Sequence, residues 1–216
     1  MVTNASQSPA YCSGIDVSHH QGTIDWSKLK SADPAIGLVN FVYIKATEGV
    51  GYIDPMALTY AQGAKAAGLR IGYYHFASLN DPNVSNDAAA EARYFDSQLK
   101  TLPAADLVPV LDLETNKSNL SPQLVQQWIT AFLDTMNQLG YPSVMLYSYQ
   151  PFLDQYLPAG HPFGKLPLWL AQYRNVPQPT LPKGWTAYTI WQYSNQGKLA
   201  GFTTNVDLNK AVASFC

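Results

Sequence analysis

Residues 108–116 read Val-Pro-Val-Leu-Asp-Leu-Glu-Thr-Asn, an apolar run that ends in two carboxylates spaced two positions apart. Near-continuous apolar residues are typical of a parallel strand that is covered on both faces. Successive side chains of a strand point to opposite faces, so Asp112 and Glu114 point the same way, with Cα atoms about 6.6 Å apart. In such sheets ligands bind at the carboxyl ends of the strands. The stretch therefore predicts a buried strand that delivers an acid pair to an active site.

Two carboxyl groups this close do not ionise independently, because the pKa of one rises while its neighbour stays charged. Acid catalysis of glycoside cleavage uses such a pair. Two other interpretations of the spacing stay open, namely an exposed acid pair beside a turn and a pair of metal ligands.

Length and composition favour one globular domain. The chain has 216 residues, of which 47% are hydrophobic, and a net charge of -2 without a basic stripe. We therefore expect no nucleic-acid partner and no membrane partner, and no apolar run is long enough to span a bilayer. We predict a polar extension at 1–13 and a barrel domain at 14–216. The start of the chain lacks the apolar centre of a signal peptide, so we expect a secreted protein whose signal peptide has been removed. We also expect a monomer.

Strands and helices alternate over the first two thirds of the chain, and this alternation predicts a parallel sheet. Strands are expected at 14–18, 41–46, 71–76, 108–113 and 144–147, and helices at 24–29, 55–67, 85–99 (with Ser85 as cap), 122–139 (with Ser121 as cap) and 151–157. Further strands are expected at 168–171, 188–193 and 206–208, but the links between them are rich in Pro and Gly. We expect hairpins there, with some strands antiparallel. Eight strands favour a closed barrel over an open sheet.

Closure of the barrel would place Asp16, on the first strand, beside Asp207, on the last. Both acids lie within apolar strands, where an unpaired charge is costly, and they would join Asp112 and Glu114 at the barrel mouth. In the alternative interpretation Asp16 and Asp207 are structural and pair with Lys45 or Arg70. Glu48, after the second strand, is either a further site residue or a solvated loop acid.

Aromatic and amide side chains follow the same strands. Sugar rings stack on aromatic rings, and their hydroxyls need hydrogen-bonding partners. The candidates for substrate binding are Tyr74, Phe76, Tyr147, Trp169, Gln172, Tyr173 and Gln192. Alternatively, part of these rings fill the barrel core. We interpret His19, His20 and His75 as hydrogen-bonding residues, because no metal-ligand spacing is present, and we expect no metal and no cofactor.

The two cysteines lie near the ends of the chain, at Cys12 and Cys216. If the fold brings the termini together, they can form a disulfide worth up to about 5 kcal/mol. Such a bond implies an oxidising compartment. Two free thiols are the alternative.

Seven motifs in order resemble glycoside hydrolase family 25, the Chalaropsis-type lysozymes. They are Gly-Ile-Asp-Val-Ser-His-His-Gln-Gly from Gly14, Tyr-Ile-Lys-Ala-Thr-Glu-Gly from Tyr43, Gly-Tyr-Tyr-His-Phe from Gly72, Val-Leu-Asp-Leu-Glu from Val110, Leu-Trp-Leu-Ala-Gln-Tyr from Leu168, Trp-Gln-Tyr-Ser from Trp191 and Val-Asp-Leu-Asn from Val206. The resemblance implies an α/β fold, a modified TIM-like (β/α)5(β)3 barrel in a single domain. It also implies hydrolysis of the β-1,4 bond between N-acetylmuramic acid and N-acetylglucosamine in bacterial peptidoglycan.

By resemblance, Glu114 matches the family's general acid, Asp112 the second carboxylate, and Asp16 and Asp207 the remaining acids. Asp112 would either attack the anomeric carbon or orient the substrate's 2-acetamido group, and both routes retain configuration. Two other functions are weighed against this one: a chitinase-like β-1,4-N-acetylglucosaminidase and a non-catalytic peptidoglycan-binding barrel. The first typically has a longer run of alternating aspartates before its glutamate, and the second would lose an acid.

Overall fold

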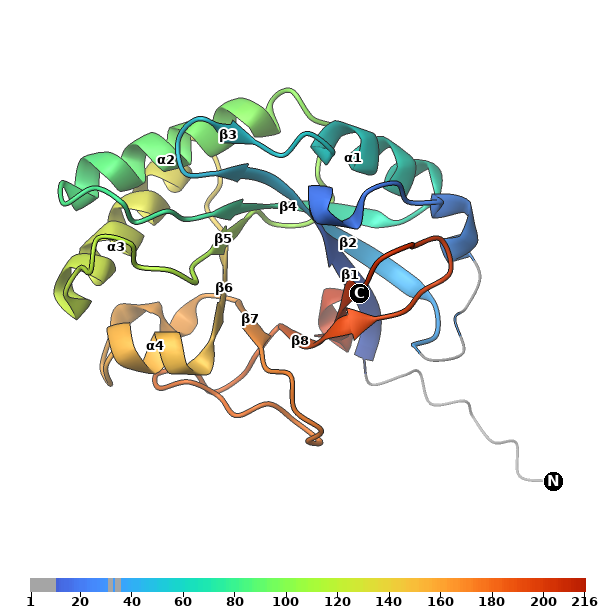
Figure 1. The fold of residues 1–216 in the computed structure, drawn as a ribbon. Helices are drawn as coiled ribbons and strands as arrows, with labels where there is room; N and C mark the ends of the chain where they lie inside the picture. Colours follow the sequence, from blue (N-terminus) through green and yellow to red (C-terminus); the bar gives the residue numbers. More distant parts are fainter. Residues whose placement is uncertain (1–10, 31–32, 34–35) are drawn as a thin grey trace.

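A closed barrel forms the centre of the computed structural model, which describes residues 11–30, 33 and 36–216 (Figure 1). The strands in these residues are β1 (Tyr11–Val17), β2 (Val39–Glu48), β3 (Tyr52–Ile53), β4 (Arg70–Phe76), β5 (Val110–Asp112), β6 (Met145–Tyr149), β7 (Leu168–Ala171), β8 (Ile190–Gly197) and β9 (Val206–Val212). Their order is β1-β9-β8-β7-β6-β5-β4-β2-β3, and pairing of β1 with β2 closes the ring. Strand β3 pairs only with the end of β2. The predicted single-domain, modified TIM-like barrel is confirmed.

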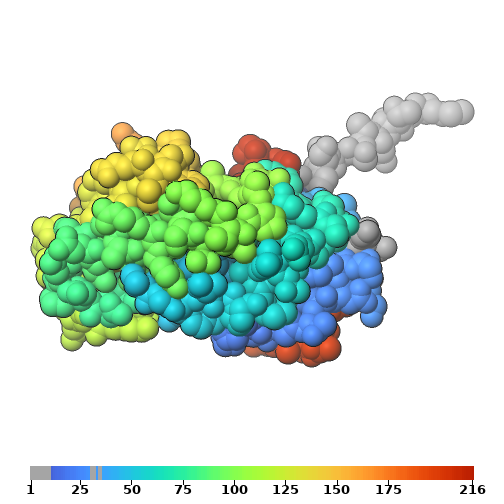
Figure 2. Space-filling view, turned by 90° about the horizontal axis from the view of Figure 1, so that it is seen from above, coloured from blue at the N-terminus to red at the C-terminus, as the bar shows by residue number. Residues whose placement is uncertain are grey.

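Among the described residues, four α-helices lie outside the barrel (Figure 1): α1 (Ala57–Ala66), α2 (Val84–Leu99), α3 (Pro122–Gln138) and α4 (Gln150–Tyr156). Seen from above, α1 and α2 form much of the surface over this side (Figure 2). Short 3-10 helices are η1 (His19–Gln21), η2 (Trp26–Lys30), η3 (Pro162–Lys165) and η4 (Ala213–Phe215). The helix expected at 24–29 is thus a 3-10 turn. No helix in the described part of the chain is long and apolar enough to cross a membrane.

The two predicted helix caps have different outcomes. Ser121 caps α3 as predicted, because its side chain accepts a hydrogen bond from the N–H of Leu124. The prediction of Ser85 as the cap of α2 is wrong, since this helix begins one residue earlier, at Val84. The carboxylate of Asp81 accepts a hydrogen bond from the N–H of Asn83 and so forms the turn that starts the helix.

The last third of the barrel differs from the prediction in one link. Strands β8 and β9 form an antiparallel hairpin, as expected, but β7 and β8 are parallel. The chain between them, 172–189, is long enough to return to the starting end of the barrel without a helix, which a parallel pairing requires. The hairpin prediction for β7 and β8 is therefore wrong, because Pro and Gly in a link do not determine its direction.

Every second side chain of a strand points into the barrel, and these inward side chains form a lower and an upper level along the barrel axis. The lower level is apolar and contains aromatic rings such as Phe41 and Tyr43, both on β2. Gly14 and Gly72 lie against these two rings, and a Cβ at either glycine would overlap the ring beside it. The upper level, at the carboxyl ends of the parallel strands, receives polar side chains from the same faces. The sequence thus fills the lower half of the barrel and leaves the mouth open.

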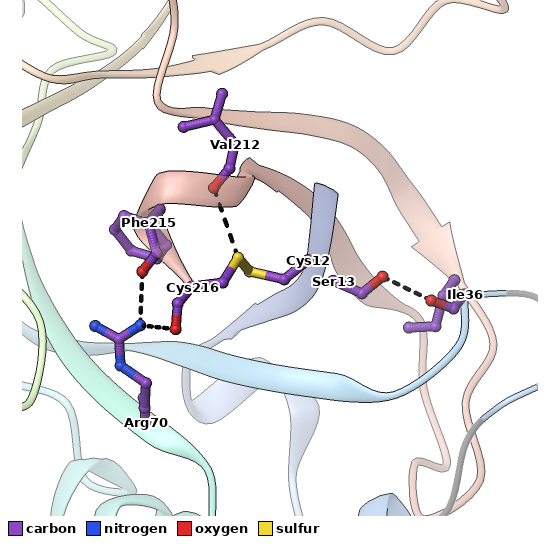
Figure 3. Close-up of a disulfide and its surroundings, with 7 residues drawn as sticks. All are labelled: Cys12, Ser13, Ile36, Arg70, Val212, Phe215 and Cys216. Atoms are coloured by element: carbon purple, nitrogen blue, oxygen red, sulfur yellow. Dashed lines mark hydrogen bonds between the residues drawn. A yellow bond between two sulfur atoms is a disulfide. The ribbon is translucent and has the colours of Figure 1, made fainter. Parts of the chain in front are cut away.

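A disulfide between Cys12 and Cys216 joins β1 to the end of the chain, across a sequence separation of 204 (Figure 3). The predicted bond is present. The guanidinium of Arg70 donates hydrogen bonds to the carbonyl oxygens of Phe215 (2.6 Å) and Cys216 (3.1 Å). Because β1 begins at Tyr11, the boundary expected after residue 13 lies inside this strand, and residues 1–10 of the expected extension lie outside the described residues.

Candidate active site

Four carboxyl groups meet at the mouth of the barrel. Asp16 lies near the carboxyl end of β1, Asp112 ends β5, and Glu114 follows two residues later. Asp207 lies near the start of β9, and this end reaches the same mouth because β9 is antiparallel to β1, where Asp207 pairs in register with Asp16. All four side chains line one cavity of about 220 Å³. The structure therefore brings together the four acids that the sequence singles out.

Two amide side chains hold Asp16 in place. Its Oδ2 accepts hydrogen bonds from Nε2 of Gln192 (2.9 Å) and Nδ2 of Asn209 (2.7 Å). The indole N–H of Trp169 donates to Oδ1 of Asn209 at 2.7 Å, and because this group is only a donor, it fixes the orientation of the amide. The hydroxyl of Tyr147 donates to Oε1 of Gln192 at 2.8 Å and fixes the second amide in the same way.

Asp207 holds a proton beside Asp16. Burial, followed by the negative charge of Asp16, raises the pKa of Asp207 to about 9. Burial raises the pKa of Asp16, and the hydrogen bond that Asp16 accepts from Asp207 opposes this increase. At neutral pH Asp207 is therefore the donor and Asp16 the acceptor of this pair.

Asp112 and Glu114 form a second pair of carboxyl groups. Asp112 is only 4% exposed, and burial together with the charge of Glu114 raises its pKa well above the ordinary value. Burial also raises the pKa of Glu114, against the opposing effect of the hydrogen bond that it shares with Asp112. A hydrogen bond between two carboxyl groups requires one proton, so the pair titrates as a unit and holds that proton between them.

One oxygen atom of this pair, on a residue that lines the cavity, is buried without a hydrogen-bond partner in the part of the chain that the structure describes. Oδ1 of Asp112 is buried and makes no hydrogen bond within the described residues. A buried acceptor of this kind gains free energy when a ligand supplies a donor. The pair thus offers a proton donor and an open acceptor to a molecule bound in the cavity.

Most of the predicted substrate-binding residues line the same cavity: Tyr74, Phe76, Tyr147, Trp169 and Gln192. The rings of Tyr147 and Trp169 lie with centroids 4.8 Å apart. Three predicted residues do not line it. Glu48 lies outside and accepts a hydrogen bond from Lys45 (2.8 Å), whereas Gln172 and Tyr173 line a neighbouring cavity that shares Glu114.

Comparison with known proteins decides the family, because the model of glycosyl hydrolases family 25 matches residues 15–202. The chain belongs to glycosyl hydrolases family 25. It is 36% identical over 210 residues to Lysozyme M1 of Streptomyces globisporus, and the aligned region covers 91% of this chain and 66% of that protein. It is 32% identical over 199 residues to the N,O-diacetylmuramidase of Chalaropsis sp, with 84% and 87% covered. The crystal structure of the bacterial lysozyme from Streptomyces coelicolor superposes with a TM-score of 0.79 at 32% identity, covering 96% of this chain and 95% of that one. The chain thus spans slightly less than two thirds of Lysozyme M1.

Three further residues of this family 25 barrel line the cavity and are absent from the predicted set: Ser18, His20 and Lys45. The signal for Lys45 is present in the sequence, because it shares one face of its strand with Phe41 and Tyr43. A charge on an otherwise apolar interior face indicates a function at the open end of the barrel. Ser18 and His20 carry no comparable signal.

For this family 25 chain, the alternative interpretation in which Asp16 and Asp207 pair with Lys45 or Arg70 is wrong. Lys45 forms its ion pair with Glu48, and Arg70 binds the carbonyl oxygens at the chain end. Asp16 and Asp207 instead contact each other.

Two of the three histidines that were predicted to be hydrogen-bonding residues lie within hydrogen-bond distance of a carboxylate. Nδ1 of His19 lies 3.0 Å from the carboxylate of Asp54, and Nε2 of the buried His75 lies 2.7 Å from that of Glu91. The predicted hydrogen-bonding roles of these two histidines are confirmed.

Proposed function

We propose that this chain is a lysozyme, a 1,4-β-N-acetylmuramidase that hydrolyses the bond between N-acetylmuramic acid and N-acetylglucosamine in bacterial peptidoglycan. Family membership and the names of the relatives, lysozyme and N,O-diacetylmuramidase, support this function. The observation that carries the proposal is the carboxyl pair of Asp112 and Glu114, which holds one proton beside an open acceptor.

Glu114 is the general acid of the proposed reaction. It is the more exposed member of the pair, so a bound glycan reaches its carboxyl group. Glu114 donates the proton to the glycosidic oxygen as the bond between that oxygen and the anomeric carbon breaks. General acid catalysis typically contributes about 10²–10⁴-fold to the rate.

Asp112 assists through the substrate's 2-acetamido group. The N–H of that group donates a hydrogen bond to the open Oδ1 of Asp112, which favours the ionised form of Asp112 and moves the shared proton to Glu114. The acetamido carbonyl oxygen then attacks the anomeric carbon. Water opens the resulting ring from the other side of that carbon and gives its proton to Glu114, so the configuration is retained.

The remaining residues hold the sugar. Asp16 and Asp207 hydrogen-bond its hydroxyl groups, with one acid an acceptor and the other a donor. Gln192 supports them, and the aromatic rings of the cavity contact the apolar faces of the sugar. We assign these contacts to Tyr74, Phe76, Tyr147 and Trp169. Glu48 acts through Lys45, which it positions, whereas Gln172 and Tyr173 contact the glycan beyond the bond that is cleaved.

Release of reducing sugar from peptidoglycan and from chitin tests this function. We expect release from peptidoglycan alone and its loss in Glu114→Gln, a variant of the same size whose circular dichroism stays unchanged. Asp134→Asn, an exposed acid on α3, is the matched control and keeps full activity. Release from chitin would favour a chitinase-like enzyme, and binding of peptidoglycan without release would favour a non-catalytic barrel. Near-normal activity of Glu114→Gln would remove this residue from the acid role.

The enzyme acts outside the cell and as a monomer in this proposal, without a nucleic-acid or membrane partner. The disulfide between Cys12 and Cys216 supports an oxidising compartment. Light scattering of the purified chain tests the oligomeric state, and a mass of twice that of one chain would contradict it.

A further inference from the structure

A second cavity, of about 360 Å³, shares Glu114 with the catalytic cavity. Its other walls include Tyr149, Gln172, Tyr173 and Arg174. The proposed function uses Glu114 as the acid and assigns Gln172 and Tyr173 to contacts with the glycan, but it gives Arg174 no role. Because Glu114 lies between the two cavities, a molecule in the second one lies beside the bond that receives the proton.

The walls of this cavity are fixed by the catalytic network itself. The hydroxyl of Tyr173 donates to Oε1 of Gln192 at 2.5 Å, and the backbone N–H of Gln172 donates to the carbonyl of Gln192 at 3.0 Å. The indole of Trp191 donates to the carbonyl oxygen of Gln172 at 2.9 Å. These hydrogen bonds hold the segment before Arg174 on β8, so the backbone that carries the Arg174 side chain is held in place.

The guanidinium of Arg174 makes no ion pair and no hydrogen bond with any described residue. By contrast, Lys45 is paired with Glu48, and Arg70 binds the chain end. Arg174 is thus an unpartnered cation next to a strongly acidic cavity. A guanidinium binds a carboxylate with two parallel hydrogen bonds, a geometry that a free arginine beside a groove can offer to a ligand.

We propose that this second cavity binds a carboxylate carried by the glycan strand, through Arg174. The inference rests on the proposed function, because it takes peptidoglycan as the substrate. Glycan strands of peptidoglycan offer two sources of this group, the lactyl group of muramic acid and the stem peptide attached to it. Chitin offers neither, so binding here favours peptidoglycan over chitin.

Soluble glycan strands prepared in four forms test this proposal. One form keeps its stem peptides, and a second has them removed by an amidase, which leaves the lactyl carboxylate free. The other two are the same strands with their carboxylates converted to amides. For Arg174→Gln on strands with carboxylates we expect KM to rise about tenfold and kcat to change little, as for the loss of one charge-assisted interaction. On amidated strands the variant and the unchanged chain should have the same KM.

The control is Arg93→Gln, an exposed arginine on α2, which should leave KM unchanged on every strand. A rise in KM only on strands without stems identifies the lactyl group, a rise only on strands with stems identifies the peptide, and a rise on both shows that the site accepts either carboxylate. An unchanged KM for Arg174→Gln, or an equal rise on amidated strands, overturns the carboxylate site while the lysozyme function stands. If the unchanged chain cleaves no form, the proposed function itself fails.

Discussion

Asp16 and Asp207 lie directly opposite each other on β1 and β9, at the seam where the antiparallel strand closes the barrel. Their carboxyl groups share one proton, which Asp207 holds and Asp16 accepts. Two acids that would repel each other as carboxylates are therefore compatible within one small cavity. The same arrangement recurs in Asp112 and Glu114, so the four acids form two hydrogen-bonded pairs.

Replacing Asp207 with Asn should flatten the pH dependence of stability. Burial and the charge of Asp16 raise the pKa of Asp207 to about 9, whereas an aspartate in the unfolded chain titrates near a pKa of about 3.9. Between these values the native state binds a proton that the unfolded state lacks. The free energy of unfolding of the unchanged chain therefore falls as pH rises, by on the order of 1 kcal/mol per pH unit. An asparagine carries no such dependence.

Urea unfolding of both chains, at a mildly acidic and a mildly alkaline pH, measures this effect. Asp207→Asn should gain stability relative to the unchanged chain at the alkaline pH. An equal difference at both values would contradict the raised pKa of Asp207.

Replacing Asn209 with Ala should weaken both the fold and the reaction. The change leaves the buried indole N–H of Trp169 without its acceptor and Asp16 without one of its two amide donors. Each buried polar group left unsatisfied costs about 1–3 kcal/mol. The midpoint temperature of thermal unfolding and kcat should both fall. The control Asn175→Ala, at an exposed residue, should change neither. A normal kcat in the Asn209 variant would show that the position of Asp16 does not depend on this amide.

Strand periodicity made the carboxyl cluster predictable. Asp112 and Glu114 lie at the end of a strand that is apolar on both faces, and Asp16 and Asp207 are acids within the first and the last apolar strands of the chain. Once closure is assumed, these patterns place the four acids together, because strand ends converge at the mouth. The resemblance to family 25 could therefore be checked against a separate physical argument.

Other features depend on distances that periodicity does not supply. The parallel pairing of β7 with β8 depends on where the chain 172–189 returns, and its composition is compatible with either direction. The partner of Lys45 depends on side-chain reach, which brings its ammonium to Glu48 rather than to Asp16. The location of the shared protons depends on relative burial, and that quantity exists only in the folded chain.

Reduction of the disulfide between Cys12 and Cys216 should destabilise the barrel. The bond joins residues 204 positions apart, and closing so long a loop stabilises the native state by about 5 kcal/mol in the entropic model. The hydrogen bonds of Arg70 to the chain end do not involve the sulfur atoms, so we expect the reduced barrel still to fold. Urea unfolding with and without reductant measures the loss. The double variant Cys12→Ser/Cys216→Ser should be insensitive to reductant, and an equal unfolding midpoint in all samples would argue against this stabilisation.

Replacing Lys45 with Met should shift the alkaline limb of the rate profile to higher pH. Burial raises the pKa of both Asp112 and Glu114, and the positive charge of Lys45 lowers both. The proposed reaction needs the proton of this pair, so activity is lost as pH rises through the pKa of the pair. Without the charge of Lys45 that pKa rises further, and kcat/KM should persist to higher pH even if its maximum is lower. The control is Lys117→Met, because Lys117 is exposed and pairs with Glu48 (3.7 Å) outside the cavity. Equal shifts in the two variants, or none in the first, would show that Lys45 does not tune the acid.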